Sequence, residues 1–144
     1  GTSFGISTIY LAAAIKDNGG GILIGTELEE SKQKVAVANL KKAGLDNLID
    51  IRPGDALETL KNVPDQIDMV FLDGWKDLYV PVIKLLKPRL RPGAVIIAED
   101  VLAFKRICKP YTDYMQSGKN GFASMTLTFA SGIEYSCFQG GKTA

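Results

Sequence analysis

The stretch DMVFLDGWKDLY, residues 68–79, decides how the fold of this chain is interpreted. Its apolar run stops abruptly at Asp73, and Trp75 and Lys76 follow within three residues. Charged groups are costly to bury, so a strand that ends on an acid places a charge at the edge of a sheet. An acid, an indole and an amine so close together suffice for metal ligation, packing on a flat ring and proton abstraction. A strand followed by a solvated helix start is the alternative interpretation.

Outward from this stretch, apolar strand-like runs alternate with helix-like runs, which is typical of an α/β fold with a mostly parallel sheet. Ser31 is the predicted N-cap of one helix and Gly44 its predicted stop, and Arg91-Pro92-Gly93 is predicted to form a turn. The predicted strands are 21–28, 48–52, 67–73 and 94–100, and the predicted helices are 6–15, 31–43, 56–61, 78–87 and 110–116.

The end of the chain departs from this alternation. Residues 123–129 and 132–138 are predicted strands joined only by Ala130 and Ser131, which indicates an antiparallel hairpin. The predicted fold class is therefore α/β, a doubly wound, mostly parallel sheet with a C-terminal antiparallel hairpin. One domain is expected over residues 1–138, with 139–144 as a flexible tail. No strand precedes the helix near Gly1, so we expect a missing first strand, a gap in the sheet and an N-terminally incomplete chain.

The composition excludes several classes of function. The chain has 144 residues, 46% of them hydrophobic, which suits one compact domain. Seventeen basic and sixteen acidic residues give a net charge of +1, which offers no electrostatic footprint for nucleic acid or an anionic membrane. The absence of histidine excludes a histidine base, a Ser-His-Asp triad and a His-ligated metal within this chain. No apolar run could span a bilayer, so a cytoplasmic protein is expected.

Two features together predict a nucleoside-binding site. Residues 1–7, GTSFGIS, form a small-residue turn that opens a helix, where glycines let the backbone approach a ligand and free N–H groups face an anion. The spacing differs from G-x-G-x-x-G, which disfavours a nicotinamide-dependent oxidoreductase. Glu27 follows about 20 residues later at a strand end, where a carboxylate can accept hydrogen bonds from both ribose hydroxyls. The alternative for Glu27 is a solvated acid in a glutamate-rich loop.

Three more acids lie at predicted strand ends. Asp55 follows Pro53-Gly54 and either reaches the crevice where adenine would lie or caps the next helix. Glu99 and Asp100 end their strand beside Asp73 of the neighbouring strand, which makes a cluster of hard oxygen donors suited to Mg²⁺ or Ca²⁺. Without a cation, such like charges raise one another's pKa. A plain loop start is the alternative.

These motifs resemble those of the class I S-adenosylmethionine-dependent O-methyltransferases of the catechol and caffeoyl-CoA type. The glycine turn is similar to their first motif, Thr26-Glu27-Leu28 to their ribose-binding acid, and Gly54-Asp55-Ala56 to their adenine-side motif. The segment FLDGWKDLY, residues 71–79, is especially close to catechol O-methyltransferase. The resemblance covers nearly the whole chain.

The resemblance implies a role for each matching residue. Asp73 would line the cofactor site and ligate a metal ion, and Lys76 would take the proton from the acceptor hydroxyl. The metal, Mg²⁺ by resemblance, would be held by Asp73, Glu99 and Asp100. The cofactor S-adenosylmethionine would be bound at three places. Glu27 would hold its ribose, and Asp55, Ala56 and Trp75 would surround its adenine. Its methionine portion would be bound by the residues of the glycine turn, Gly1, Thr2, Ser3, Gly5 and Ser7.

Two departures leave alternatives open. Glu99-Asp100 replaces the family's Asp-Asn pair, and no residue clearly matches the acid that contacts a catechol's second hydroxyl, for which Glu134 is a poor candidate. The expected function is methyl transfer to a hydroxyl of a small aromatic acceptor with help from a divalent cation, in a protein for which the resemblance implies a homodimer. The rivals are a metal-independent methyltransferase with a different acceptor and a non-catalytic remnant that binds cofactor or a partner protein.

Overall fold

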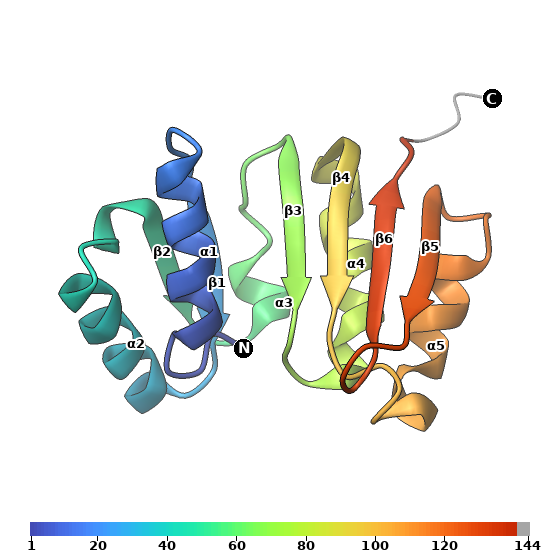
Figure 1. The fold of residues 1–144 in the computed structure, drawn as a ribbon, viewed down its shortest axis with the longest axis horizontal. Helices are drawn as coiled ribbons and strands as arrows, with labels where there is room; N and C mark the ends of the chain where they lie inside the picture. Colours follow the sequence, from blue (N-terminus) through green and yellow to red (C-terminus); the bar gives the residue numbers. More distant parts are fainter. Residues whose placement is uncertain (141–144) are drawn as a thin grey trace. The chain divides into compact units, whose positions relative to one another are not determined.

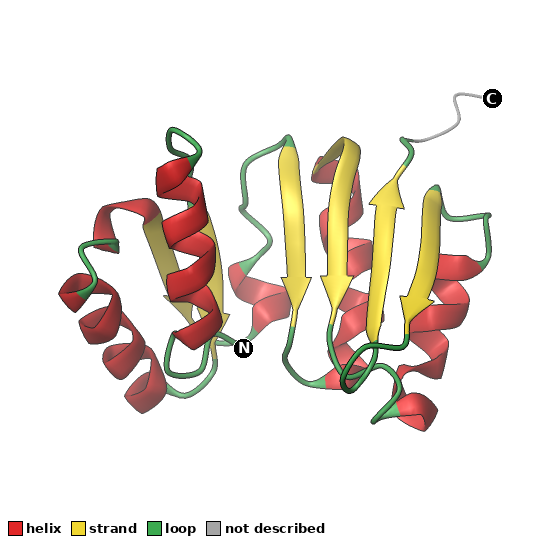
Figure 2. Cartoon of the chain, in the orientation of Figure 1, coloured by secondary structure: helices red, strands yellow, loops and turns green. Residues whose placement is uncertain are grey.

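The structure is a computed structural model that describes residues 1–140 of the chain. The chain folds as two compact units, Gly1–Asn62 and the segment from Val63 onward. Each unit contains its own sheet flanked by helices, so the predicted α/β class is confirmed (Figures 1 and 2). The strands form two sheets, one of two strands and one of four. The assignment of residues 1–138 to one domain stays a prediction, and most of the predicted tail, 141–144, lies outside the described residues.

The first unit is a pair of parallel strands with helices packed against them. Leu23 lies opposite Ile49 in the sheet, and Glu27 lies opposite Pro53. Its core contains Ala12, Leu40 and Leu45, which bring the first two helices onto the sheet. The elements are α1 (Ile6–Asp17), β1 (Leu23–Glu27), α2 (Glu30–Lys42), the 3₁₀ turn η1 (Asp46–Leu48), β2 (Ile49–Pro53) and α3 (Ala56–Thr59).

The ends of α2 test the predicted helix signals. The predicted N-cap Ser31 is wrong, because the helix begins at Glu30 and Glu29 takes the N-cap position without a side-chain cap. The N–H of Glu29 instead donates to the carboxylate of Glu27, two residues earlier, at 3.0 Å, so this local side-chain contact sets the entry into the helix. Gly44 has φ of +65°, the left-handed conformation that favours glycine, and it ends the helix as predicted.

The second unit is a four-stranded sheet in the order β3-β4-β6-β5. The first two strands are parallel, and the last two form the predicted antiparallel hairpin, which is confirmed. Two helices, α4 and α5, lie together behind the sheet in the view of Figure 1. The elements are β3 (Ile67–Leu72), η2 (Lys76–Leu78), α4 (Tyr79–Leu86), η3 (Lys87–Arg89), β4 (Leu90–Ala98), α5 (Lys105–Gln116), β5 (Phe122–Leu127) and β6 (Ile133–Phe138).

Three predicted boundaries in this unit are wrong. Arg91-Pro92-Gly93 is a bulge inside β4 rather than a turn before it, because the register slips between the Ile67 and Met69 pairs. The hairpin link spans residues 128–132 instead of two residues. Helix α5 starts at Lys105 and carries a proline in its interior, because its buried side chains recur at helical spacing on both sides of that proline.

The register of β3 and β4 places their carboxyl ends side by side. Leu72 and Ala98 are paired as the last residues of the two strands. The pairing continues one step further, since the N–H of Glu99 donates to the carbonyl of Leu72 at 3.0 Å. The acids that follow both strands therefore leave the sheet at the same edge. No helix within residues 1–140 combines the length and apolar character that crossing a membrane requires.

Candidate active site

In the first unit, the turn that opens α1 is tied to the end of β1. Gly5 is the N-cap of α1 with φ of +89°, and a Cβ placed on it would lie 3.2 Å from the Cβ of Ala36. Glycine therefore lets the turn pass close to helix α2. The N–H of Thr2 donates to the carbonyl of Thr26 at 2.8 Å, which fixes the turn to the strand end.

Glu27, the predicted ribose acceptor, is the centre of this arrangement. Its side chain accepts from the backbone N–H of Ser3 at 2.6 Å through Oε2 and from that of Glu29 at 3.0 Å through Oε1. The residue is only 7% exposed, so the alternative of a solvated loop acid is wrong. Each carboxylate oxygen has a second lone pair, so these two bonds leave acceptor capacity for a ligand hydroxyl.

Burial and hydrogen bonding act in opposite directions on the Glu27 carboxylate. Burial favours the neutral acid, but the N–H groups of Glu29 and Ser3 favour the charged form more, so the pKa of Glu27 lies below its ordinary value. In the unfolded chain the group keeps its ordinary pKa and binds protons at a higher pH than the folded protein does.

This difference predicts an acid-sensitive first unit. The stability that Glu27 contributes is fully present above its unfolded pKa, near 4.5, and is lost as the pH falls through the lower folded value. Urea unfolding between pH 7 and pH 3 should show a fall in stability over this window that is smaller in Glu27→Gln. An identical pH dependence in both proteins would contradict the assignment.

Asp55 serves as a helix cap, which was one of its two predicted roles. Its Oδ1 accepts from the N–H of Leu57 at 2.8 Å, at the start of the short helix α3, where Ala56 is the first residue. The preceding Gly54 has φ of +118°, and its N–H donates to the carbonyl of Glu27 at 2.8 Å. The predicted adenine-side segment and the predicted methionine-side turn therefore both meet the chain at Glu27.

In the second unit, Lys76 is surrounded by the predicted catalytic acids. Its Nζ lies 2.9 Å from Oδ2 of Asp100 and 3.6 Å from Oδ1 of Asp73, and its side chain is 11% exposed. Nζ also donates to the hydroxyl of Tyr79 at 2.9 Å and lies 5.7 Å from the ring centre of Phe104. The strand ends of β3 and β4 thus bring the predicted base and two predicted metal ligands together.

The electrostatics of this cluster favour a charged lysine. Burial lowers the pKa of Lys76, but its hydrogen bonds to Tyr79 and Asp100 outweigh that effect and raise the pKa above its ordinary value. Burial, followed by the negative charges of Asp73 and Asp100, raises the pKa of Glu99. The carboxylates of Asp73, Glu99 and Asp100 are therefore close enough to influence one another's charge, and the Lys76 ammonium lies beside them.

The predicted metal ligands do not form a finished metal site. Asp73, Glu99 and Asp100 supply the hard oxygen donors that Mg²⁺ prefers. Within residues 1–140, however, no three His, Cys, Asp or Glu side chains are arranged to hold a metal ion. The ammonium of Lys76 instead lies 2.9 Å from Asp100 and 3.6 Å from Asp73. The donor chemistry suits a divalent cation, and the metal assignment stays a prediction.

Trp75 and Glu134 have contrasting surroundings. The Trp75 residue is 76% exposed, so its ring face is available for the predicted packing on adenine. Glu134 is fully buried and accepts from Gln116 at 2.9 Å and from the hydroxyls of Ser124 and Thr126. It is therefore an internal carboxylate satisfied by neutral donors, in line with its description as a poor substrate contact.

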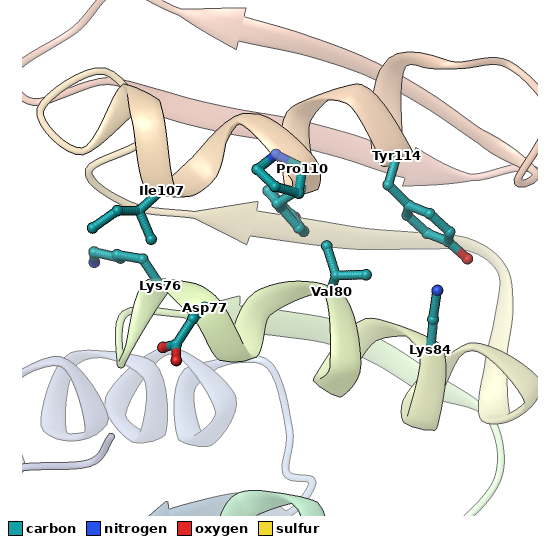
Figure 3. Close-up of a pocket in the computed structure, with 8 residues that line it drawn as sticks. Lys76, Asp77, Val80, Lys84, Ile107, Pro110 and Tyr114 are labelled. Atoms are coloured by element: carbon teal, nitrogen blue, oxygen red, sulfur yellow. The ribbon is translucent and has the colours of Figure 1, made fainter.

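A groove of about 360 Å³ runs between the η2–α4 segment and α5. Figure 3 shows Lys76 and Lys84 at opposite ends, with Val80 and Pro110 between them and Ile107 near Lys76. Sequence reasoning did not anticipate this groove, because its two walls come from helices that are distant in the chain. It also missed the role of Tyr79, for which the three-residue spacing from Lys76 was the available signal.

Comparison with known proteins identifies the family. Residues 1–101 match the model of a family described as a methyltransferase domain. A catechol O-methyltransferase of Niastella koreensis is 34% identical over 106 residues, which cover 71% of this chain and 47% of that protein. Catechol O-methyltransferase B of Danio rerio is 29% identical over 142 residues, 94% of this chain and 51% of that protein. The chain thus spans about half the length of these curated relatives.

Solved structures agree with this comparison. The O-methyltransferase TomG of Streptomyces achromogenes, in complex with SAM, is 25% identical with a TM-score of 0.84, covering 97% of this chain and 71% of that one. A cofactor-bound protein from MTB is 25% identical with a TM-score of 0.88, covering 98% of this chain and 71% of its own. The resemblance to catechol and caffeoyl-CoA O-methyltransferases is confirmed, and the chain belongs to the methyltransferase-domain family.

Proposed function

We propose that this chain transfers a methyl group from S-adenosylmethionine to a hydroxyl of a small aromatic acceptor. The proposal rests on the position of Lys76. Its amine is held at the edge of a sheet by Asp100 and Tyr79. A lysine fixed at the carboxyl ends of parallel strands is placed where α/β folds bind their ligands. In the first unit, Glu27 and the turn before α1 would hold the cofactor.

The chemistry assigns one proton transfer to Lys76. Once deprotonated, its amine takes the proton of the acceptor hydroxyl. The acceptor oxygen then bonds to the methyl carbon while the carbon–sulfur bond breaks, and the electron pair of that bond stays on sulfur. The products are the methylated acceptor, S-adenosylhomocysteine and a protonated lysine. The remaining contribution is positional, because alignment of oxygen, carbon and sulfur supplies much of the rate.

We extend the proposal to a divalent cation, Mg²⁺, held by Asp73, Glu99 and Asp100. When bound, such a cation would polarise the acceptor oxygen and lower its pKa. The support for it is the donor chemistry of three neighbouring carboxylates, and burial together with the negative charges of Asp73 and Asp100 raises the pKa of Glu99. Lys76 would have to release Asp73 and Asp100 to make these oxygens available.

One observation favours a second candidate, a methyltransferase without a metal. The ammonium of Lys76 already neutralises Asp100 at 2.9 Å, as a cation would. Such an enzyme would use the same base and cofactor with a different acceptor. In the first proposal, chelation with EDTA should abolish turnover and added Mg²⁺ should restore it. Unchanged turnover in EDTA would instead favour the metal-independent enzyme.

The first test of the proposed function is calorimetric titration with S-adenosylhomocysteine, with and without Mg²⁺. Binding at micromolar strength, about −8 kcal/mol, is expected for a formed cofactor site. Methyl transfer from labelled S-adenosylmethionine to a panel of hydroxylated aromatic molecules should then identify the acceptor class. A chain that binds the cofactor product but methylates none of them would be the non-catalytic alternative. A folded chain that does not bind it would contradict the proposal.

A further inference from the structure

The hydroxyl of Tyr79 lies where the ends of β3 and β4 meet Lys76. It donates to the carbonyl of Leu72 at 2.9 Å, lies 3.3 Å from the carbonyl of Glu99, and accepts from Nζ of Lys76 at 2.9 Å. The residue is 2% exposed and packs edge-on against Tyr111, with ring centres 5.4 Å apart. One buried side chain therefore connects the catalytic amine to both strand ends.

We propose that Tyr79 is the positioning residue for Lys76, holding its amine at the strand ends for proton transfer. The inference rests on the proposed function, because it assumes that Lys76 is the base. The tyrosine itself need not touch the acceptor or the cofactor. It acts through the hydrogen bond that it accepts from Nζ.

The directions of the hydrogen bonds support this role. A phenol hydroxyl has one proton, and here that proton is directed to the backbone carbonyl of Leu72. The same carbonyl accepts the N–H of Glu99, so both of its lone pairs are used and the contact is fixed by the sheet. The Tyr79 oxygen can then only accept from Lys76. Because burial raises the pKa of Tyr79 to about 12, its hydroxyl keeps its proton at neutral pH.

The contacts of Nζ then define which of its three N–H positions can exchange a proton with the acceptor. An ammonium group has three protons. One is directed to Tyr79 and one to Asp100, both at 2.9 Å. Asp73 is 3.6 Å away, beyond hydrogen-bond range. The third N–H position of Nζ therefore has no close acceptor in Asp73, and it is the position left for proton exchange with an acceptor hydroxyl. Without Tyr79 the long, flexible lysine side chain would lose the contact that orients it.

The test is Tyr79→Phe, with Tyr111→Phe as the matched control. Tyr111 is also a buried tyrosine, and it faces Ser136 without a hydrogen bond of good geometry among the described residues. Tyr79→Phe should lower kcat by about 10- to 100-fold, the cost of a misplaced catalytic group, without changing KM or S-adenosylhomocysteine affinity. Tyr111→Phe should leave kcat near the wild-type value. Equal kcat in wild type and Tyr79→Phe, or an equal fall in both variants, would overturn the proposal.

Two further measurements separate this proposal from the proposed function. Lys76 should react several-fold faster with an amine-acylating reagent in Tyr79→Phe than in wild type, measured peptide by peptide, whether or not methyl transfer occurs. Unchanged acylation would overturn the role of Tyr79 alone. If Tyr79→Phe does not fold, proton NMR of the wild type decides. A nuclear Overhauser contact between the Lys76 ammonium and the Tyr79 hydroxyl supports the proposal, and its absence overturns it.

Discussion

Replacing Lys76 with methionine is expected to lower kcat by roughly 10²- to 10⁴-fold, the usual contribution of a general base. Methionine keeps an unbranched apolar stem of similar length, so the packing of the side chain is largely retained while the amine is lost. The affinity for S-adenosylhomocysteine should remain at the wild-type value, because none of the residues predicted to bind the cofactor in the first unit is changed. Single-turnover kinetics and calorimetry would measure the two quantities separately.

The pH dependence of wild-type kcat tests the assignment of Lys76 as the general base. The ion pair with Asp100 and the bond to Tyr79 raise the pKa of Lys76, so the amine is protonated at neutral pH. Only the deprotonated amine accepts a proton, so kcat should increase as the pH rises toward that pKa. Lys76→Met should lose this increase. A kcat that is independent of pH in the wild type would argue against a lysine base.

Lys84→Met is the matched control for this substitution. Lys84 lies at the other end of the same groove, with Nζ 5.5 Å from the ring centre of Tyr114, and among residues 1–140 it forms no salt bridge with a carboxylate. The control removes the same charge from the same unit and should keep kcat near the wild-type value. A comparable loss of kcat in both variants would mean that the net charge of the unit matters, not the placement of Lys76.

Replacing Glu27 with glutamine is expected to weaken S-adenosylhomocysteine binding by about 10- to 100-fold, which corresponds to roughly 1.5–3 kcal/mol for a lost charged hydrogen bond. The reason is the pair of backbone donors, since the N–H groups of Ser3 and Glu29 point at different carboxylate oxygens. An amide offers only one acceptor oxygen, so its NH₂ group would face one of these N–H groups. The turn that is predicted to hold the methionine portion would then lose its anchor.

The control for Glu27 is Glu30→Gln, which makes the same chemical change on the surface of the first unit. Glu30 pairs with Lys34 at 2.8 Å, and both side chains are about 70% exposed, so Glu30→Gln should leave S-adenosylhomocysteine affinity and stability close to the wild-type values. Calorimetric titration of both variants compares affinity, and urea unfolding compares stability. Wild-type affinity in Glu27→Gln would contradict both the ribose role and the anchoring role of this acid.

The order and type of the elements could be predicted from the sequence. Apolar runs near 23–27, 49–53 and 67–72 are short and bounded by turn residues, while 30–42 repeats its apolar positions at helical spacing. Periodicity of this kind is a local property, because it records which side of each segment is buried. The switch to antiparallel pairing was likewise predictable, since a short link between two strands cannot make a crossover.

The predicted element boundaries that were wrong depend on contacts that form only in the folded chain. Ser31 is a good capping residue, but the carboxylate of Glu27 already binds the N–H at the helix start, so the cap moves to Glu29. Pro110 suits the first turn of a helix, yet α5 extends five residues before it, where Cys108 adds a buried position. In the first case a local side-chain hydrogen bond, and in the second the packing of buried side chains, outweighs the intrinsic preference of a single residue.

The sequence by itself determined which chemical groups stand at the strand ends, including Asp73, Lys76 and Asp100, since their positions follow from the alternation of strands and helices. Only the tertiary structure decided which of them are partners. Lys76 meets Asp100 and Tyr79, and Glu27 meets Ser3, because hydrogen bonds form only when donor and acceptor come within about 3 Å. That distance is shorter than the spacing of neighbouring strands, so it depends on register and packing that no local pattern specifies.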